Sequence, residues 1–307
     1  MNAPIGKHLA VVAGFLFAGV PVIALGDNDA DTRVVDCAGG GSVQDALAKK
    51  KLDRPLTLII RGACTEHVAI TQDDVTLQGD GGSISGSVTV DGARRAVVAD
   101  LGISNPAGNG VTITNGAAAT LRNNRIDDSS GYGVFLRHAS FAVVNDNTML
   151  RNGIVNNSDV DASGIGVAQG SMVRAARNQI ADNANTGIEV FENCTYRGEG
   201  DSVAMRASGP GRSAVDTFRA GLVDLRGATV TGHVFVNQQA QFQSRNLEGL
   251  ATTLSNGNIA VSGLSFFRLR AGVVRAASTL GCNSAAGSFA VCVCDGFPGS
   301  VCPVAVP

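Results

Sequence analysis

The 307-residue chain has no tryptophan and only two tyrosines, and aromatic residues make up 5% of it. Glycine is abundant by contrast, with 39 residues. Few large rings and many glycines favour a fold with many tight turns around a narrow aliphatic core.

The chain also lacks an excess of basic residues. It carries 24 Lys and Arg against 26 Asp and Glu, and residues 1–26 contain one lysine and no acid. Proteins that bind nucleic acid usually have a clear basic excess, which neutralises phosphates. The composition therefore predicts no nucleic acid partner.

A long apolar run is absent after residue 26, but one lies before it. The run LAVVAGFLFAGVPVIAL follows Lys7 and ends at Ala24-Leu25-Gly26, just before the acidic stretch DNDAD. This order is typical of a cleaved signal peptide. A membrane anchor is the alternative, which the short run, Pro21 and the following acids disfavour. We predict a signal peptide over residues 1–26, a secreted or periplasmic protein, and no membrane contact after cleavage.

All seven cysteines follow residue 26. In an oxidising compartment pairing is expected, and the spacing predicts a disulfide between Cys37 and Cys64 while Cys194 is left over. Further pairs are expected among the C-terminal cysteines, which are Cys282, Cys292, Cys294 and Cys302. A zinc site is the alternative for these four, but the paired C-x₂-C arms of such sites are missing.

A repeat of about 20 to 25 residues occupies the middle of the chain and predicts a β-solenoid. An Asn-x-apolar element recurs at Asn124, Asn147 and Asn178. A Gly-apolar-x-apolar element recurs at Gly110, Gly133, Gly166 and Gly187. One interval is longer because it holds the extra stretch IVNNSDVDAS, which we interpret as an inserted loop. The asparagines are expected to stack at one corner, where the amide bonds to the backbone and to the next turn.

These patterns predict an all-β fold, a single right-handed parallel β-helix over residues 27–280, followed by a Cys-rich tail over 281–307. Alternate strand residues point inward. The expected aliphatic core ladder consists of Val111, Ile113, Val134, Leu136, Ile188 and Val190. Ser42 is a good N-cap, and Val43, Ala46 and Leu47 follow at helical spacing, so a short helix should cap the N-terminal end.

Two segments, CAGGGSVQDALAK and LTLIIRGACTEHVAITQDDVTLQGDGG, together with the Asn-containing coils, resemble the right-handed parallel β-helix proteins of the pectate-lyase-like superfamily. The resemblance covers about residues 34–280. It implies the fold strongly and an activity weakly, because the family includes polysaccharide lyases, hydrolases, C5-epimerases, phage tailspikes and adhesins.

Outward residues of successive turns should form rows about 4.8 Å apart, suited to a linear polymer. One expected row is Thr112, Phe135, Ala168 and Glu189. The neighbouring row is Thr114, Arg137, Gly170 and Phe191. We therefore predict a polysaccharide partner, with substrate contacts from Tyr132, Phe135, Asp159, Asp161, Phe191 and Glu192.

Catalysis is a further hypothesis, with candidates Arg137, His138, Asp127, Asp128 and Glu189. In a lyase or epimerase acting on an acidic glycan, Arg137 would neutralise the sugar carboxylate, and His138 or Tyr132 would move protons. The aspartates could hold Ca²⁺, the one cofactor considered. A hydrolase would instead use two of the carboxylates.

The absence of known catalytic motifs argues against an active enzyme. The Gly-Asp-Asp, Gly-His-Gly and Arg-Ile-Lys motifs that the resemblance to polygalacturonases would imply are missing, and only Asp127-Asp128 remains. The alternative is a non-catalytic surface or periplasmic β-helix that binds a glycan or a partner, in which these charges form an ordinary surface.

Overall fold

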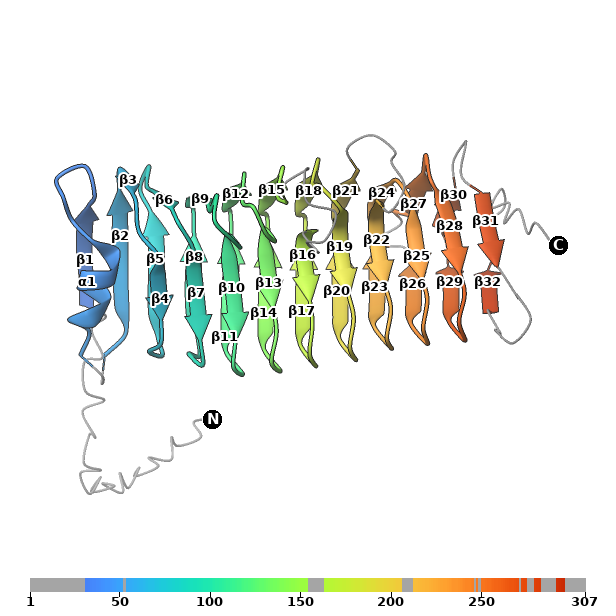
Figure 1. Cartoon of the computed structure of the whole chain (residues 1–307), viewed down its shortest axis with the longest axis horizontal. Helices are drawn as coiled ribbons and strands as arrows, with labels where there is room; N and C mark the ends of the chain where they lie inside the picture. Colours follow the sequence, from blue (N-terminus) through green and yellow to red (C-terminus); the bar gives the residue numbers. More distant parts are fainter. Residues whose placement is uncertain are drawn as a thin grey trace, which may run out of the picture.

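The computed structural model describes residues 31–270 apart from 52–53, 154–162, 206–211, 246 and 248–249. Beyond residue 270 it describes the backbone of 272–274, 279–282 and 291–295. The chain winds into a right-handed parallel β-helix in which each turn, or rung, adds one strand to each of three parallel sheets. Rungs lie side by side along the long axis (Figure 1). The predicted fold class is confirmed.

The three sheets are called A, B and C. Sheet A comprises β1 (Asp31–Asp36), β2 (Leu56–Arg61), β5 (Val75–Gly79), β8 (Ala96–Ala99), β11 (Ala118–Arg122), β14 (Phe141–Asn145), β17 (Met172–Ala176), β20 (Thr195–Glu199), β23 (Leu222–Arg226), β26 (Gln241–Arg245), β29 (Phe266–Arg270) and β32 (Val291–Asp295). Sheet B comprises β3 (Ala63–Cys64), β6 (Ser83–Ser85), β9 (Gly102–Ser104), β12 (Arg125–Asp127), β15 (Thr148–Leu150), β18 (Gln179–Ala181), β21 (Ser202–Ala204), β24 (Thr229–Thr231), β27 (Thr252–Ser255) and β30 (Gly272–Val274). Sheet C comprises β4 (Val68–Ile70), β7 (Val88–Asp91), β10 (Val111–Thr114), β13 (Val134–Leu136), β16 (Ser163–Val167), β19 (Thr186–Val190), β22 (Ser213–Thr217), β25 (Val234–Val236), β28 (Asn258–Val261) and β31 (Thr279–Cys282).

The core is a stack of inward aliphatic side chains, as predicted. The six residues of the expected core ladder, Val111, Ile113, Val134, Leu136, Ile188 and Val190, are all fully buried. Strands β31 and β32 continue sheets C and A into the segment that the sequence assigned to a C-terminal tail. The side chains of the four cysteines in that segment lie outside the described residues, as do residues 1–26.

The predicted glycine repeat is wrong at one position, Gly166. Ile165 pairs with Val134 on one side and with Ile188 on the other, so Gly164 stands level with Gly133 and Gly187. Gly166, which the sequence placed in this position, lies two residues further along the strand. The extra stretch IVNNSDVDAS hides the register in the sequence, because Gly164 and Gly166 both follow it and both precede an apolar residue.

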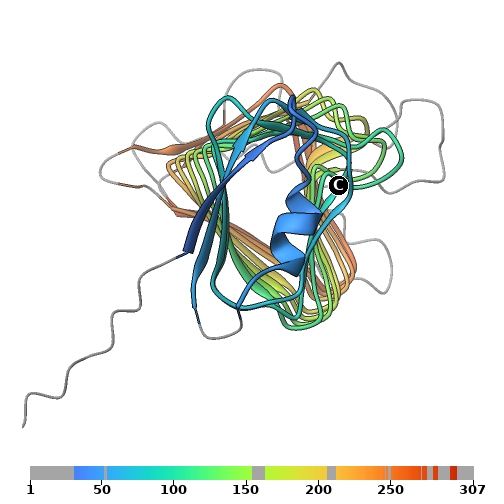
Figure 2. The same cartoon turned by 90° about the vertical axis from the view of Figure 1, so that its left-hand side faces the viewer.

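Helix α1 (Val43–Ala48) lies across the N-terminal end of the coil, as predicted (Figure 2). Ser42 is its N-cap, and the Ser42 hydroxyl accepts a hydrogen bond from the Asp45 amide at 3.1 Å. Val43 and Leu47 are buried against the first rungs. The cap thus shields apolar side chains that no preceding rung covers.

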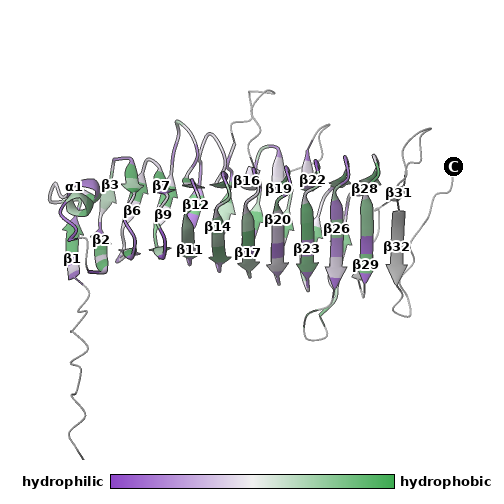
Figure 3. Ribbon diagram, turned by 90° about the horizontal axis from the view of Figure 1, so that it is seen from below, coloured by the Kyte–Doolittle hydropathy of each residue, from purple (hydrophilic) through white to green (hydrophobic). Residues whose placement is uncertain are grey.

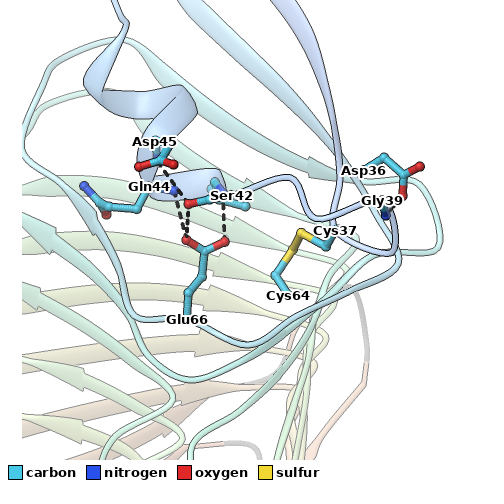
Figure 4. The surroundings of a disulfide bond; sticks show 9 residues. Asp36, Cys37, Gly39, Ser42, Gln44, Asp45, Cys64 and Glu66 are labelled. Carbon is cyan, nitrogen blue, oxygen red and sulfur yellow. Dashed lines mark hydrogen bonds between the residues drawn. A yellow bond between two sulfur atoms is a disulfide. The ribbon is translucent and has the colours of Figure 1, made fainter.

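Glu66 and a disulfide hold this cap on the first rungs (Figure 4). The Glu66 carboxylate accepts hydrogen bonds from the Ser42 hydroxyl at 2.9 Å and from the Val43 amide at 2.8 Å, two groups at the positive end of the helix. The predicted disulfide between Cys37 and Cys64 is confirmed, with Cα atoms 5.1 Å apart.

A ladder of buried amides joins sheets A and B, as the Asn repeat predicted. The side-chain oxygen of Asn147 accepts the Asn124 amide at 3.0 Å, and that of Asn178 accepts the Asn147 amide at 3.0 Å. Asp201 continues the ladder, since its Oδ1 accepts the Asn178 amide at 2.8 Å while the Tyr196 hydroxyl donates to Oδ2 at 2.9 Å. Each rung therefore satisfies a buried donor of the rung before it.

Two further ladders that the sequence did not indicate occupy the other corners. Between sheets B and C, the Ser129 amide donates to the Asn152 side chain at 3.2 Å, and the Asn152 amide to Asn183 at 2.9 Å. Between sheets C and A, the Ser171 amide lies 3.2 Å from the Cys194 sulfur. Cys194 is thus a buried ladder residue, and burial raises the pKa of its thiol to about 11.

The Asn ladder yields a first prediction. Asn147→Ala removes the acceptor of the Asn124 amide and the donor to the Leu121 carbonyl, both in the buried corner. Because buried groups left without partners cost about 1–3 kcal/mol each, we expect the free energy of unfolding to fall by about 3 kcal/mol. Urea denaturation followed by circular dichroism measures this. Asn145→Ala, at the end of the preceding strand β14, is the control, and an equal effect there would contradict the ladder's role.

Asp201 yields a second prediction. Burial raises its pKa from 3.8 to about 6, so the folded chain binds the proton more tightly than the unfolded chain. The resulting stabilisation is fully present below pH 3.8 and is lost as the pH rises through about 6. The loss amounts to about 3 kcal/mol.

Asp201→Asn restores the amide found on the preceding rungs and should abolish this pH dependence. We expect the variant to be more stable than the wild type at neutral pH, with the two converging as the pH falls. Urea unfolding across a pH series is the measurement, and Asp182→Asn, at an exposed corner position, is the control. An unchanged pH profile in Asp201→Asn would refute the account.

Candidate functional site

The outer face of sheet C carries a continuous row of side chains, one from each rung. Parallel pairing sets the row in the order Thr112, Phe135, Gly166, Glu189, Asp216, Phe235 and Ala260. The predicted row was right at Thr112, Phe135 and Glu189 but wrong at Ala168, because Gly166 pairs with Phe135. We call this row the sheet C ladder.

Glu189 is the most enclosed charged residue of the ladder, with 6% of its surface exposed. The Tyr132 hydroxyl donates to Glu189 Oε2 at 2.8 Å, and the Ser163 hydroxyl donates to the same oxygen at 3.2 Å. Tyr132 reaches across an intervening rung because Gly166 has no side chain. A Cβ at Gly166 would lie only 2.4 Å from the Tyr132 ring. The carboxylate is therefore held in one orientation.

Asp216 stands beside Glu189 on the next rung, and the sequence analysis missed it. The two residues are register partners on β19 and β22, so their backbones are about 4.8 Å apart and both side chains point outward. The alternation in the strand SAVDT was the available signal, since it marks Asp216 as an outward residue between buried neighbours.

Aromatic rings flank this carboxylate pair along the ladder. On one side the Tyr132 and Phe135 rings stack, with centroids 4.5 Å apart. On the other side Phe235, on the rung after Asp216, stacks on His233 at 5.9 Å. Phe135 and Phe235 are partly exposed, so each offers a ring to solvent.

The predicted second row follows the sheet C strands and is also shifted. The Ala168 amide donates a hydrogen bond to the Leu136 carbonyl, so Ala168 lies level with Arg137. The prediction had put Gly170 at this position of the row. The Arg137 guanidinium lies over the Phe135 ring at 5.9 Å. Phe191 stacks on Phe218 at 5.1 Å, one rung further on. These residues border the sheet C ladder on one side.

His138 and Glu192 lie at the turns between sheets C and A, rather than on strands. His138 Nδ1 is 2.9 Å from the Thr114 hydroxyl, and Glu192 pairs with Arg219 at 3.4 Å. Both adopt positive φ, 54° and 56° respectively, as these sharp turns require. His138 is exposed and one residue beyond Arg137, at the edge of the face.

Asp127 and Asp128 lie at the opposite corner, between sheets B and C. Arg151 binds Asp128 at 2.7 Å and Asp127 at 3.0 Å, and Arg125 also pairs with Asp127 at 2.7 Å. The hydrogen bond from Arg151 holds the pKa of Asp128 below its usual value. The strand β13 separates these aspartates from Arg137 and His138.

The structure thus brings Tyr132, Phe135 and Glu189 together and places Asp127 and Asp128 in a separate ion-pair cluster. Asp159 and Asp161 lie outside the described residues. The roles given to all these side chains in the sequence analysis stay predictions.

The aspartates predicted to hold Ca²⁺ are engaged in ion pairs or lie outside the described residues. Asp127 and Asp128 would have to release Arg151 to bind Ca²⁺. Cys37, Cys64 and Glu66 also lie close enough to share an ion, but their sulfurs form the disulfide and Glu66 caps α1.

Chemically, the ladder offers two adjacent carboxylates between aromatic platforms. A carboxylate accepts hydrogen bonds from hydroxyl groups, and two of them can act as proton donor and acceptor. Aromatic rings provide flat apolar surfaces on both sides. The arrangement suits a long ligand that alternates hydroxyl groups and apolar faces.

Within the described residues, no helix is long and apolar enough to cross a membrane.

Comparisons with known proteins identify the fold. A family model described as a right handed beta helix region matches residues 62–206. No curated protein matches the chain. Among solved structures, the pectate lyase Pel9A gives a TM-score of 0.59 at 11% identity, covering 91% of this chain and 83% of that one.

Two further structures are similar at lower scores. A pectate lyase from Bacillus sp. N165 in complex with trigalacturonate gives 0.40 at 11% identity, covering 65% of this chain and 81% of that one. ORF18 of Geobacillus virus E2 gives 0.48 at 9% identity, with 86% and 62% covered. At identities this low, the similarity shows the fold and nothing about activity. The chain has the right-handed parallel β-helix fold, and its residues 62–206 match the family model of that region.

Proposed function

We propose that the protein binds a polysaccharide along the sheet C ladder. The observation that carries this proposal is the arrangement of Glu189 and Asp216 between the exposed rings of Phe135 and Phe235. Sugar rings have an apolar face that stacks on aromatic rings and hydroxyl groups that donate to carboxylates. The ladder offers both surfaces in the order that a linear glycan would meet them.

The geometry of the coil supports a linear rather than a branched ligand. Adjacent rungs are about 4.8 Å apart, close to the length of one sugar residue along an extended chain. The rungs are stacked in a straight line, so outward residues of successive rungs follow one another along the axis (Figure 1). The fold shared with Pel9A, a pectate lyase, fits a polysaccharide ligand without selecting one.

Cleavage of the bound glycan is a second candidate function, favoured by the adjacency of Glu189 and Asp216. In a hydrolysis, one carboxyl group would give its proton to the glycosidic oxygen as the C–O bond breaks. The other carboxylate would accept a proton from the attacking water. Tyr132 and Ser163 donate to the Glu189 carboxylate and hold it in place, so in this proposal Glu189 is the base and Asp216 is the acid.

A lyase or epimerase receives less support from the same geometry. These reactions need a cation beside the sugar carboxylate and a base for the C5 proton. Arg137 is the nearest predicted cation, but it lies at the edge of the face, over Phe135. His138 lies at a turn and bonds to Thr114. The central carboxylates instead favour hydrolysis, with binding alone as the alternative.

We also propose that the protein is exported and works outside the cytoplasm. The Cys37–Cys64 disulfide fits an oxidising compartment, where such bonds persist. The apolar run before residue 26 would direct the export. Extracellular polymers would then be accessible to the sheet C ladder.

Binding is tested by replacing the aromatic platforms. A glycan array of linear neutral and acidic polysaccharides identifies the polymer, and isothermal titration measures its affinity for wild type, Phe135→Ala and Phe235→Ala. Each variant should bind about 5- to 30-fold more weakly, since the lost ring contact contributes about 1–2 kcal/mol. Phe141→Ala, which removes a partly exposed ring from sheet A, is the control. Failure of every polymer to bind, or equal losses in the control, would contradict the proposal.

Cleavage is tested with Glu189→Gln and Asp216→Asn. On the polymer that the array identifies, the wild type should release reducing ends, and each variant should be slower by a factor of about 100 or more. Asp128→Asn, in the separate ion-pair cluster, should keep full activity. Ultraviolet absorbance of unsaturated uronates would indicate a lyase instead. Binding without any turnover would leave the ladder as a binding surface only.

A further inference from the structure

The outer face of sheet A holds a second surface that the proposed function does not use. Register pairing aligns outward arginines on successive strands, since Arg174 pairs with Arg197 and Arg226 pairs with Arg245. Further arginines, Arg122, Arg268 and Arg270, point outward from the same sheet. Figure 3 looks onto this sheet and shows hydrophilic bands on β20, β26 and β29.

A groove of about 460 Å³ opens on this face and is lined by three of the arginines. Arg174, Arg197 and Arg226 line it together with Asn145 and one acid, Glu199. Glu199 bonds to Arg226 at 3.2 Å. The lining is therefore positively charged although the whole chain has a net charge of −2.

Arg174 and Arg197 are the unusual pair in this groove. They stand directly opposite each other on adjacent strands, where like charges destabilise a sheet. Among the described residues, neither has a carboxylate within ion-pair distance. Asp224, on the rung after Arg197, is instead bound by Arg245 at 2.6 Å. Both guanidinium groups are exposed and can take an external anion.

We propose that this groove binds a linear polysaccharide that carries carboxylates on successive sugars. Guanidinium groups bind carboxylates through two parallel hydrogen bonds, which a neutral glycan cannot accept. The rung spacing of about 4.8 Å sets neighbouring arginines at intervals close to one sugar residue. This site is on a different sheet from the sheet C ladder and does not depend on it.

A nucleic acid is the main other polyanion, and the groove fits it less well. Single strands bind through bases stacked on aromatic rings. No aromatic ring lines the groove among the described residues, and Arg174 lies over the nearby Phe141 ring at 5.9 Å. A duplex needs a broad basic surface, whereas this one is a narrow stripe bordered by Glu199 and Asp224.

The experiment compares polygalacturonate with its fully methyl-esterified form, which has the same backbone and no charge. Migration of the wild-type protein should be retarded on affinity gels that contain polygalacturonate and not on gels that contain the ester. The retardation should weaken as the salt concentration rises. The double variant Arg174→Gln and Arg197→Gln should bind at least about tenfold more weakly. Arg61→Gln with Arg95→Gln changes the net charge equally but removes arginines paired elsewhere, and should bind normally.

Other outcomes would overturn the proposal. Equal retardation of the groove variant and the wild type would show that the groove takes no polyanion. Equal binding of double-stranded DNA, lost in the same variant, would reassign the groove to nucleic acid. Loss of polygalacturonate binding in Phe135→Ala but not in the arginine variant would place all acidic-glycan binding on sheet C.

Discussion

The structure depends on the satisfaction of buried polar groups between one rung and the next. A coil that turns sharply between three sheets must bury backbone amides at its corners, and each buried amide needs an acceptor. Here the acceptor is a side chain of the following rung: an amide at Asn147 and Asn178, a carboxyl at Asp201, and a sulfur at Cys194. No rung is complete by itself, so stacking is obligatory.

This constraint decides where function can lie. Inward positions are filled by aliphatic ladders and corner positions by hydrogen-bonding ladders, so only outward residues are free to vary. Register then converts any outward residue into a member of a row along the axis. Glu189 illustrates this dependence on register. Tyr132, two rungs earlier, can reach Glu189 only because Gly166, on the rung between them, has no side chain.

Much of the fold could be predicted from the sequence, because the residues that form it have strong local signatures. The asparagines at 124, 147 and 178 repeat with the coil, and Ser42 marks the start of the capping helix. The register after the extra stretch IVNNSDVDAS could not be predicted. Gly164 and Gly166 are two residues apart and have the same parity, so both fit the alternation of strand residues. Only the pairing of Ile165 with Ile188 distinguishes them.

The candidate site was harder to predict for the same reason. Moving the register by two residues puts Ala168 beside Arg137 and Gly166 beside Phe135, which changes the neighbours of Glu189. After residue 200 the asparagine signature stops, so the rungs that contribute Asp216 and Arg226 could not be counted from the sequence. The polar ladder there uses Asp201, which a repeat search for asparagine does not find.

The net charge predicts the ligands of a solenoid less well than those of a compact domain. In a coil, a residue type that recurs once per rung forms a row along the axis, while residues of opposite charge can lie on another sheet. Carboxylates at Glu189 and Asp216 stand on sheet C, and Arg174 and Arg197 stand on sheet A. These two acids and two arginines cancel in the net charge, yet each pair presents a field of one sign to a polymer lying along it. A near-neutral chain can therefore carry both a carboxylate-lined face and a polyanion groove, separated by the turns that join the sheets.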